Sequence, residues 1–388
     1  MKVVHGIMLV VLQLMSILLV NRCHANEAEP CSDAKCKLPD CWCSGTAIPG
    51  GLDVKEVPQM VTISFDDSVN VGNFKYYQLL FNNGATSRRN HNGCNITATF
   101  FVRHEYTNYQ MVQQLRHWRH EIADHTITHR TPTTWWKNAS YDEWRNEIAG
   151  QQEVLRKFGN IDADSIKGFR APYLQVGGNN QFRALYSSKF LYDCSMPTMQ
   201  TEFWPYTLDY KTTQECTVKP CPTDSFPGLW EIPMTDYTDK TGTKCAMVDE
   251  CTVNDDVTDI YDLLMTNFLS HYKKNRSPFP IFIHASWLSS HSFTTEALGK
   301  FLDAILQMKD VYIVTLSQVI QWMKNPTPLS EINKFEPWQC STAPPPPACS
   351  VATSCEYTIP PWGEHVYLRS CESPCPKNYP WYGNPDGN

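Results

Sequence analysis

The sequence predicts an α/β fold, a distorted (β/α) barrel of seven or eight strands with disulfide-stapled N-terminal, middle and C-terminal extensions. From about residue 57 onward, short β-rich runs alternate with helical patterns, as in parallel α/β folds. Cysteines gather in three segments around this core, at 31–43, 216–251 and 340–375. With 388 residues, of which 42% are hydrophobic, the chain can bury a core of this size.

Residues 1–25 have the layout of a cleavable secretion signal. Lys2 precedes an apolar stretch from Ile7 to Val20, and a small residue stands at Ala25. The stretch is too short for a comfortable membrane span, and no later segment reaches about 18 consecutive apolar residues. We therefore expect this segment to be removed and the mature protein to be secreted, extracellular and without a membrane span.

The cysteine content agrees with that compartment, because disulfides persist in oxidising surroundings. Of the 16 cysteines, Cys23 lies in the signal, so fifteen remain. An odd number predicts a free thiol or an intermolecular bond. We divide the mature chain into a Cys-rich segment at 26–56, a catalytic domain at 57–339, and a Pro/Cys-rich extension at 340–388 that packs on the core.

The chain is acidic, with a formal net charge of −7 that becomes −9 when the two cations Lys2 and Arg22 leave with the signal. An acidic surface repels polyanions, which argues against nucleic acid as a partner. We expect a monomer. Three Asn-X-Ser/Thr sequons, at Asn95, Asn138 and Asn275, predict a glycoprotein.

Periodic apolar residues predict the helices in turn. The clearest helix follows Ser140, which forms a capping box with Glu143. Further helices are predicted over about 257–272 and 296–309. The second of these leads into the strand-like "VYIVTLS" and then a final helix, which Pro326 ends.

Polar residues recur at the C-terminal ends of the predicted strands. In β/α barrels the active site is assembled at that face, from loops that follow several strands. One pocket can therefore hold the whole set, which comprises Asp66, Asp67, His125, His129, Arg170, Asp193 and His284.

The segment "HTITH" places His125 and His129 four positions apart, a spacing that suits two ligands of one metal ion. Taken alone, the pair is more often an ordinary surface or core feature. The neighbouring acids Asp66 and Asp67 strengthen the metal interpretation, because two carboxylates cannot both be buried without a cation or hydrogen-bond partners. A solvated strand end is the alternative for the acids alone.

Two histidines and one carboxylate form a common ligand set for catalytic zinc, and the second acid can then act as general base toward water. A buried Arg170 would keep that base ionised. In isolation, Arg170 is equally compatible with a surface salt bridge and His284 with a satisfied core histidine. Because both residues are predicted at strand ends with the other polar residues, we favour catalytic roles for them over structural ones.

These residues resemble the polysaccharide deacetylases of carbohydrate esterase family 4, and in particular the insect chitin deacetylases. The ordered set "SFDD", "HTITH", "RAPY", "YDCSM" and "FIHASW" carries the resemblance, together with the cysteine-rich "KCKLPDCWCSGTAIPGGL" and the tail "LRSCESPCPKNYPWYGN". It covers nearly all of the mature chain.

The resemblance implies a role for each residue of the set. Asp66 would be the catalytic base and Arg170 would orient it. The ligands of Zn²⁺, or of another divalent metal, would be Asp67, His125 and His129.

The resemblance also implies how the amide is cleaved. The backbone N–H of Tyr173 would polarise the acetyl carbonyl, and His284, paired with Asp193, would protonate the departing nitrogen. Trp204 would help to form the wall of the acetyl pocket. Trp136 and Trp287 are candidates for stacking on sugar rings, although core packing is the commoner fate of a tryptophan.

The sequence departs from the family pattern in two ways. Cys194 stands where a serine is expected beside Asp193, and it is either disulfide-bonded or the odd thiol. Only about 30 residues precede the core after the signal, too few for a chitin-binding module or a low-density-lipoprotein-receptor class A module. The chain therefore resembles the insect subgroup with a deacetylase domain alone, which is associated with gut and peritrophic matrix.

The predicted function is that of a secreted zinc-dependent chitin deacetylase acting on chitin or chito-oligosaccharides. One alternative is a chitin-binding matrix protein with little or no turnover. Another is a metallohydrolase acting on a different amide, although no HExxH helix supports a zinc peptidase. In the absence of a binding module, we expect weaker action on crystalline chitin than on soluble oligomers.

Overall fold

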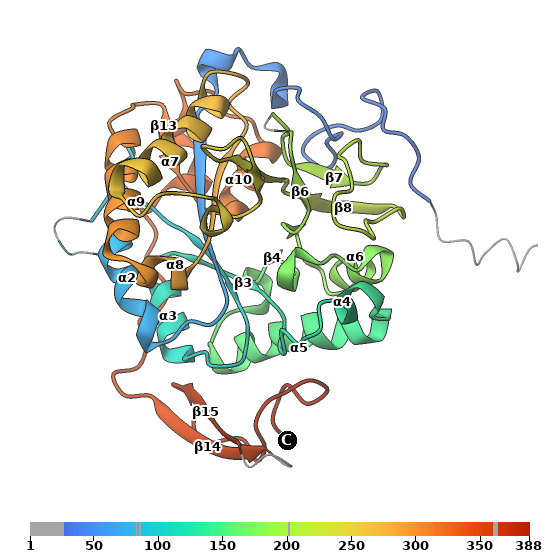
Figure 1. The fold of residues 1–388 in the computed structure, drawn as a ribbon. Coiled ribbons are helices and arrows are strands. Elements are labelled where there is room, and N and C mark those ends of the chain that lie inside the picture. Colours follow the sequence, from blue (N-terminus) through green and yellow to red (C-terminus); the bar gives the residue numbers. More distant parts are fainter. Residues whose placement is uncertain (1–26, 83, 85–86, 201, 360–363) are drawn as a thin grey trace, which may run out of the picture.

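The computed structural model describes residues 27–82, 84, 87–200, 202–359 and 364–388 (Figure 1). The predicted signal at 1–25 lies outside the described residues. No helix in the described ranges is both long and apolar enough to cross a membrane.

A nine-stranded sheet forms the centre of the molecule. Its strands follow the order β12-β1-β2-β3-β4-β5-β8-β7, and β13 pairs with the first residues of β1. Every neighbouring pair is parallel except β7 and β8. Its members are β1 (Gln59–Asp66), β2 (Thr99–Val102), β3 (Glu121–Asp124), β4 (Gly168–Phe169), β5 (Tyr192–Asp193), β7 (Tyr206–Leu208), β8 (Phe226–Glu231), β12 (Phe279–His284) and β13 (Val311–Ile313).

The predicted α/β class with a parallel sheet is confirmed. In the described part of the chain, no strand pairing joins β12 to β7, so hydrogen bonds do not close the sheet into a ring. Three small two-stranded sheets complete the β structure: β6 (Pro197–Thr198) with β9 (Met234–Thr235), β10 (Tyr237–Thr238) with β11 (Lys244–Cys245), and β14 (Thr353–Ile359) with β15 (Glu364–Ser370).

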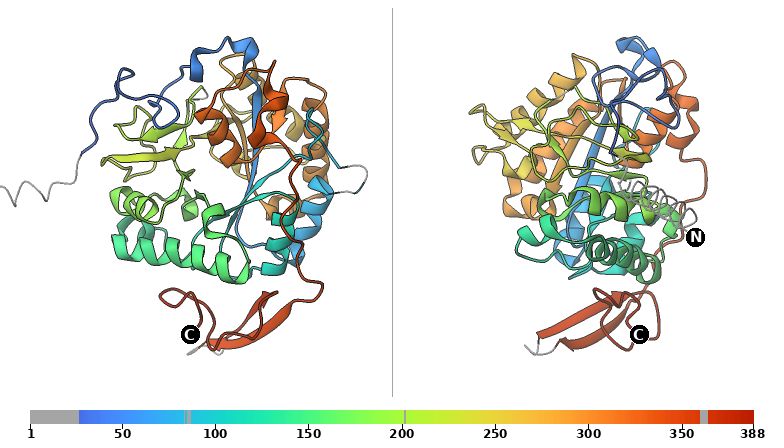
Figure 2. Two further views of the ribbon diagram at one scale, coloured as in Figure 1. Left: turned by 180° about the vertical axis from the view of Figure 1, so that it is seen from behind. Right: turned by 90° about the vertical axis from the view of Figure 1, so that its right-hand side faces the viewer.

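Helices cover the outside of the curved sheet (Figure 2). The α-helices are α2 (Val71–Phe81), α3 (Tyr109–His117), α4 (Thr134–Asn138), α5 (Tyr141–Phe158), α6 (Gly178–Ser187), α7 (Val257–Tyr272), α8 (Ala285–Ser290), α9 (Ser292–Ile305) and α10 (Leu316–Lys324). The 3₁₀ turns are η1 (Pro49–Gly51), η2 (Val54–Glu56), η4 (Ala163–Ser165), η5 (Pro172–Leu174), η6 (Val248–Glu250), η7 (Ile332–Lys334) and η8 (Glu336–Trp338).

Side chains of each strand alternate between two buried layers. In β1, Val61, Ile63 and Phe65 pack in a large outer cluster beneath the helices. Met60 points to a separate inner cluster on the other face. The sheet is therefore buried on both faces, as parallel sheets require.

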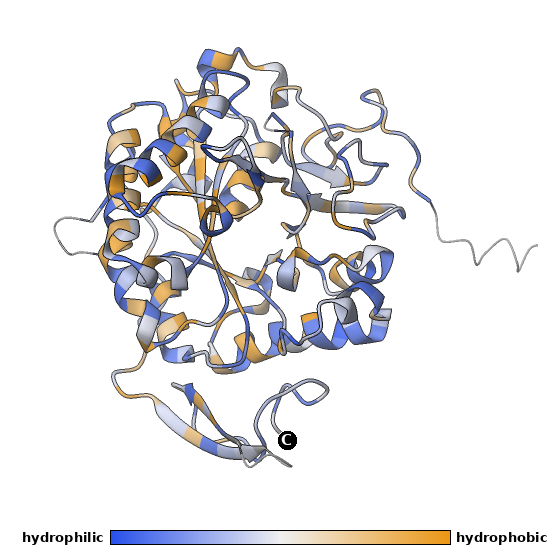
Figure 3. Cartoon of the chain, viewed as in Figure 1, coloured by the Kyte–Doolittle hydropathy of each residue, from blue (hydrophilic) through white to orange (hydrophobic). Residues whose placement is uncertain are grey.

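The predicted helices are present. The capping box between Ser140 and Glu143 begins α5, and α7 has the expected bounds. Helix α9 begins four residues earlier than expected, at Ser292 rather than Glu296. Figure 3 shows hydrophilic and hydrophobic residues interspersed along α5, as expected for a helix with one face against the core.

Seven disulfides brace the chain, and all three predicted cysteine-rich segments take part. The pairs are Cys31–Cys43, Cys36–Cys41, Cys94–Cys340, Cys216–Cys221, Cys245–Cys251, Cys349–Cys371 and Cys355–Cys375. Cys194 is a buried free thiol, which answers the question raised by the odd count.

The C-terminal extension lies outside the helical layer, beside α3 and α5 (Figures 1 and 2). Its aromatic residues contact the core: the Tyr379 ring lies 4.8 Å from that of His104, and the Arg130 guanidinium lies 4.7 Å over Tyr382. Lys157 on α5 also donates a hydrogen bond to Asp386. These contacts position the extension next to the loops that follow β2 and β3.

Candidate active site

The predicted polar residues lie at the C-terminal ends of neighbouring strands. Asp66 is the last residue of β1 and is in register with His284, the last residue of β12. His125 follows directly after β3, and Arg170 directly after β4. Because these strands are parallel and adjacent, their C-terminal ends meet at one edge of the sheet.

A buried ion pair joins two of these ends. Arg170 Nη1 donates to Asp66 Oδ1 at 2.6 Å, and the two side chains are 0% and 3% exposed. Arg170 Nη1 also donates to Ser64 Oγ, and Nε donates to the carbonyl of Cys194. The guanidinium lies 4.1 Å over the ring of Phe101. Asp66 therefore has a fixed cationic partner and a fixed orientation.

A second group is built from Asp67, His125 and His129. One possible ligand atom from each residue lies within 4.8 Å of the others. Asp67 has φ 82° and His129 has φ 44°, so both are non-glycine residues in the left-handed region. Such strained backbone commonly occurs at functional sites, where the surrounding structure stabilises it.

Hydrogen bonds fix the loop that carries the two histidines. His125 Nδ1 lies 2.8 Å from the Arg170 carbonyl oxygen, which leaves Nε2 as the nitrogen able to bind a metal. Glu147 on α5 accepts bonds from the backbone N–H groups of Ile127 and Thr128. The loop that carries the two histidines is thus held from both sides.

The charge states of this group suit a divalent cation. Burial lowers the pKa of His125 and lowers that of His129 to about 3, so both rings are neutral at physiological pH. Asp67 Oδ1 is buried without a hydrogen-bond partner among the described residues. This oxygen lies 3.5 Å from Arg103 Nε and faces two neutral imidazoles, a set of donors that fits a metal ion such as zinc. The residues therefore form a possible metal site.

His284 has a different partner from the one expected. Its Nδ1 lies 2.8 Å from Oδ2 of Asp249, a residue of η6, and its backbone N–H donates to the same oxygen. Burial opposes the cationic ring, but this hydrogen bond and the charges of Asp66 and Asp249 raise the pKa of His284 to about 9. The expected pairing with Asp193 is not formed.

Asp193 points into the protein instead. Its Oδ1 accepts hydrogen bonds from Gln181 Nε2 and Ser195 Oγ, and the residue is in register with Glu231 on β8. Burial raises the pKa of Asp193 to about 6. The side chain is fully buried and its partners come from β8 and α6, which explains why it does not reach β12.

Tyr173 lies at the rim of the metal group. It has φ 57° within η5, its ring lies 4.5 Å from that of His129, and its hydroxyl donates to the His129 carbonyl. The side chain is 44% exposed. Its position next to the group is consistent with the expected backbone contact to substrate.

The three candidate tryptophans differ in exposure. Trp136 is fully buried and donates from Nε1 to the Arg130 carbonyl, so no ring face is free to stack on a sugar. Trp204 is also fully buried, stacked 5.6 Å from Trp322 in the inner cluster. Trp287 on α8 is only partly buried, so it remains a candidate for stacking on a sugar ring.

Cys194 belongs to the same buried network. Arg170 Nη2 donates to its sulfur at 3.2 Å. Burial raises the pKa of this thiol to about 11, so it is protonated at neutral pH. The residue substituting for the expected serine is therefore an inert packing and hydrogen-bonding group.

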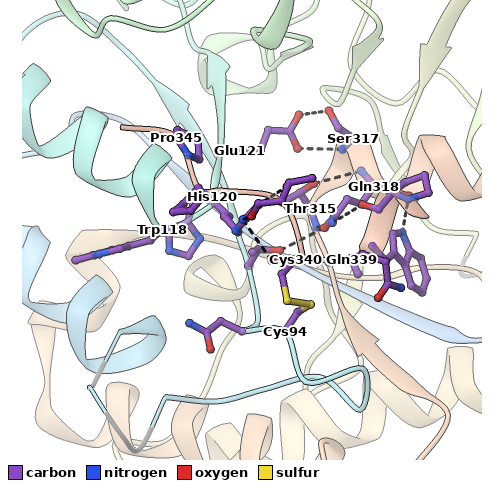
Figure 4. A pocket seen from close by; sticks show the side chains of 18 of the residues that line it. Cys94, Trp118, His120, Glu121, Thr315, Ser317, Gln318, Gln339, Cys340 and Pro345 are labelled. Carbon is purple, nitrogen blue, oxygen red and sulfur yellow. Dashed lines mark hydrogen bonds between the residues drawn. A yellow bond between two sulfur atoms is a disulfide. The ribbon is translucent and has the colours of Figure 1, made fainter. Parts of the chain in front are cut away.

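A large cavity, of about 930 Å³, lies elsewhere. It is lined by the N-terminal ends of β3 and α10 and by residues 340–345 (Figure 4). The polar residues described above lie at the opposite, C-terminal ends of the strands. Its buried carboxylate Glu121 is already satisfied by Tyr192, Thr99 and Ser317. Cavity size therefore does not identify the catalytic centre in this protein.

Sequence reasoning missed two residues of the site. Asp249 sits in a short turn next to the Cys245–Cys251 disulfide, and no periodicity links it to His284. Glu147 looks like an ordinary polar residue of a helix, yet it is 0% exposed. Burial of a charged residue on an amphipathic helix is visible only when the packing is known.

Comparison with known proteins identifies the family of this chain. Residues 53–188 match the polysaccharide deacetylase family. Chitin deacetylase 1 of Bombyx mori is 43% identical over 382 residues, which cover 94% of this chain and 69% of that protein. Chitin deacetylase 8 of the same organism is 41% identical over 388 residues, which cover 96% of this chain and 98% of that protein.

Among solved structures, a Mycobacterium smegmatis protein assigned to the polysaccharide deacetylases is 17% identical, with a TM-score of 0.47. The alignment covers 78% of this chain and 96% of that one. On the strength of the two Bombyx mori relatives, the chain belongs to the polysaccharide deacetylases of carbohydrate esterase family 4, and within them to the insect chitin deacetylases.

Proposed function

We propose that this protein is a secreted, zinc-dependent chitin deacetylase that hydrolyses the N-acetyl group of N-acetylglucosamine units to give chitosan and acetate. The observation that carries the proposal is the buried Asp66–Arg170 pair, in which Asp66 directly precedes the possible metal ligand Asp67 and is in register with His284. Amide hydrolysis requires a base and an acid beside a group that polarises the carbonyl. Asp66 and His284 lie at neighbouring strand ends beside the possible metal site.

The metal would be held by Asp67, His125 and His129. When bound, a divalent ion supplies a Lewis acid that polarises the acetyl carbonyl and makes water more acidic. His125 is oriented for this role by the Arg170 carbonyl, so the same arginine supports both the base and a ligand. Neutral imidazoles and a carboxylate are compatible with zinc and with other divalent ions.

Asp66 would accept the proton of the attacking water. Its ion pair with Arg170 fixes the orientation of the carboxylate, and the burial of both groups strengthens the interaction. The backbone N–H of Tyr173 would donate to the oxyanion that develops on the acetyl carbonyl.

His284 would donate a proton to the departing nitrogen, so that the sugar leaves as an amine. Its raised pKa keeps the ring cationic before the transfer. Asp249 acts as the positioning residue, because it fixes Nδ1 and leaves Nε2 to face the substrate. This assignment replaces the expected Asp193.

Secretion and glycosylation form part of the proposal. Seven disulfides favour an oxidising compartment, such as the gut lumen, the peritrophic matrix or the cuticle. Asn95 and Asn138 are exposed and remain candidates for glycans. The Asn275 amide donates to the carbonyls of Thr46 and Glu202, so it is already engaged.

The test is acetate release from chitin oligosaccharides by the purified protein, measured in native, chelated and zinc-restored samples and in Asp66→Asn. We expect release that requires both the metal and Asp66. If folded, metal-loaded protein binds chitin oligomers but releases no acetate, the alternative of a chitin-binding matrix protein is correct. If it releases acetate from other amides and not from chitin oligomers, the substrate assignment is wrong.

A further inference from the structure

A pocket of about 230 Å³ lies between the active-site face and the C-terminal extension. One wall comes from the first residue of α2 and the loop after β2, and the other from β15. Three of its lining side chains, Val71, Tyr106 and Tyr367, are among the large hydrophobic residues that remain exposed, at 62%, 60% and 50%. Exposed aromatic side chains gathered at one pocket indicate a binding surface.

Arg103 links the pocket residue Tyr106 to the candidate metal ligand Asp67. Arg103 Nε lies 3.5 Å from Asp67 Oδ1, and the Arg103 guanidinium lies 5.8 Å over the ring of Tyr106. These two separations and one C–N bond of about 1.3 Å place the ring centre within about 11 Å of the Asp67 carboxylate. A ligand extending from the metal group by a few sugar units reaches Tyr106.

The backbone of the loop supports a role for Tyr106. Its φ is 64°, so a bulky non-glycine residue is held in the left-handed region. Asp67, His129 and Tyr173 share this property, and all three lie around the candidate site. Thr107 stabilises the turn, because its hydroxyl donates to the Arg103 carbonyl at 2.7 Å. The loop therefore holds the Tyr106 ring outward at a conformational cost.

The chemistry of the pocket fits an uncharged sugar ring. Aromatic faces can pack against the C–H faces of a pyranose, whereas polar groups at the edge can bond its hydroxyl and acetamide groups. Glu105 and Arg369 carry opposite charges and His365 is a further polar group at the edge. A lining with both signs of charge favours a neutral occupant over an ionic one.

We propose that this pocket is a distal subsite for N-acetylglucosamine units of the same substrate chain, with Tyr106 and Tyr367 as its aromatic platforms. The inference rests on the proposed function. It assigns the C-terminal extension a role in recognising longer oligomers, because Tyr367 and His365 lie on β15 of that extension.

The experiment compares kcat/KM for acetate release from N-acetylglucosamine oligomers, from the dimer to the hexamer. We expect the wild type to prefer the hexamer. In the double variant Tyr106→Ala/Tyr367→Ala, kcat/KM should fall about tenfold for the hexamer and stay unchanged for the dimer. The double variant Tyr106→Phe/Tyr367→Phe keeps both rings and should behave as the wild type.

Tyr186→Ala is the matched control, because this tyrosine on α6 is 48% exposed but lies outside the pocket. An unchanged hexamer-to-dimer ratio in the double alanine variant overturns the subsite, as does a wild type without any preference for length. Circular dichroism must show that the variants are folded.

Calorimetric binding of the hexamer to Asp66→Asn separates the subsite from the proposed reaction. Binding that weakens about tenfold on removal of both rings supports the subsite, even if the wild type proves inactive and the deacetylase proposal fails. Binding that is insensitive to both rings overturns the subsite even where deacetylation is demonstrated.

Discussion

His284 Nδ1 lies 2.8 Å from Asp249 Oδ2, and the His284 backbone N–H donates to the same oxygen at 3.0 Å. The carboxylate therefore fixes both the ring and the backbone at the end of β12. An acidic partner stabilises the cationic ring, so the pair keeps a proton on His284, as the proposed acid role requires.

The first prediction concerns pH. His284 has a raised pKa of about 9, and the proposed mechanism uses it as an acid, so activity should fall as the pH rises through the pKa of this group. Asp249→Asn removes the anion that stabilises the cation, so the alkaline limb of kcat/KM should move to lower pH, with a loss of about tenfold or more at neutral pH.

The control for this prediction is Asp193→Asn, which alters a buried acid without contact to His284. The pH–rate profile of each variant is measured with a soluble oligomer. If the alkaline limb moves in Asp193→Asn and not in Asp249→Asn, the assigned pairing is incorrect.

The second prediction concerns the buried ion pair. Asp66→Asn and Asp66→Ala should both reduce kcat by about 100-fold or more, because the base is lost. Both changes leave the Arg170 cation, which is 0% exposed, without its anion, but only Asp66→Ala also removes the acceptor of the 2.6 Å hydrogen bond from Nη1. Asp66→Ala should therefore be the less stable of the two, with a free energy of unfolding lowered by about 3 to 5 kcal/mol. Denaturant unfolding of both variants checks this, and equal stabilities would show that Arg170 finds another partner.

The third prediction concerns the metal. His125→Ala should weaken metal binding by more than about 100-fold, beyond the usual loss for an outer partner of a ligand. Glu147→Gln should weaken it less, since Glu147 holds only the loop. Metal content after dialysis is measured by mass spectrometry, with His91→Ala as an exposed control. Equal metal content in His125→Ala and the control would exclude His125 as a ligand.

The fourth prediction concerns Cys194. Because the thiol is fully buried and its pKa is raised to about 11, it should not react with a thiol reagent in the folded protein. Denaturation without a reductant should expose one reactive thiol per mature chain. Reaction at a comparable rate in the folded state would mean that the Arg170 network opens readily.

The fifth prediction concerns glycosylation. Peptide mass spectrometry of the secreted protein should find glycans at Asn95 and Asn138 and not at Asn275. The side chain of Asn275 donates to two carbonyls, and a glycan would disrupt this arrangement. Full occupancy of Asn275 would show that the region around Thr46 and Glu202 adopts a different structure.

Sequence reasoning could locate the strand ends because an apolar run followed by an acid or a histidine is a local signal. Asp66, His125 and His284 all lie where their runs predicted. The partner of His284 could not be found in this way. Asp249 is 35 residues away in sequence and reaches β12 only through the packing of η6 against that strand.

The sequence also could not predict which individual side chains are buried. Trp136 and Trp204 are of a residue type that often contacts sugar rings. In this fold, however, both are fully buried, and each packs against the ring of another tryptophan. The odd cysteine count predicted a free thiol, but only the pairing of the other cysteines identifies it as Cys194. The residues with left-handed backbone have no common residue type that a pattern could detect.

The Pro-rich linker at 341–348 is the only covalent connection between the described core and the C-terminal extension. Cys340 is tied to Cys94 before the linker, whereas the two disulfides beyond it both close within the extension. A single proteolytic cut in the linker would therefore release the extension from its last covalent attachment to the described core, leaving contacts such as Lys157 with Asp386. Loss of the extension would then remove His365 and Tyr367 from the proposed distal subsite.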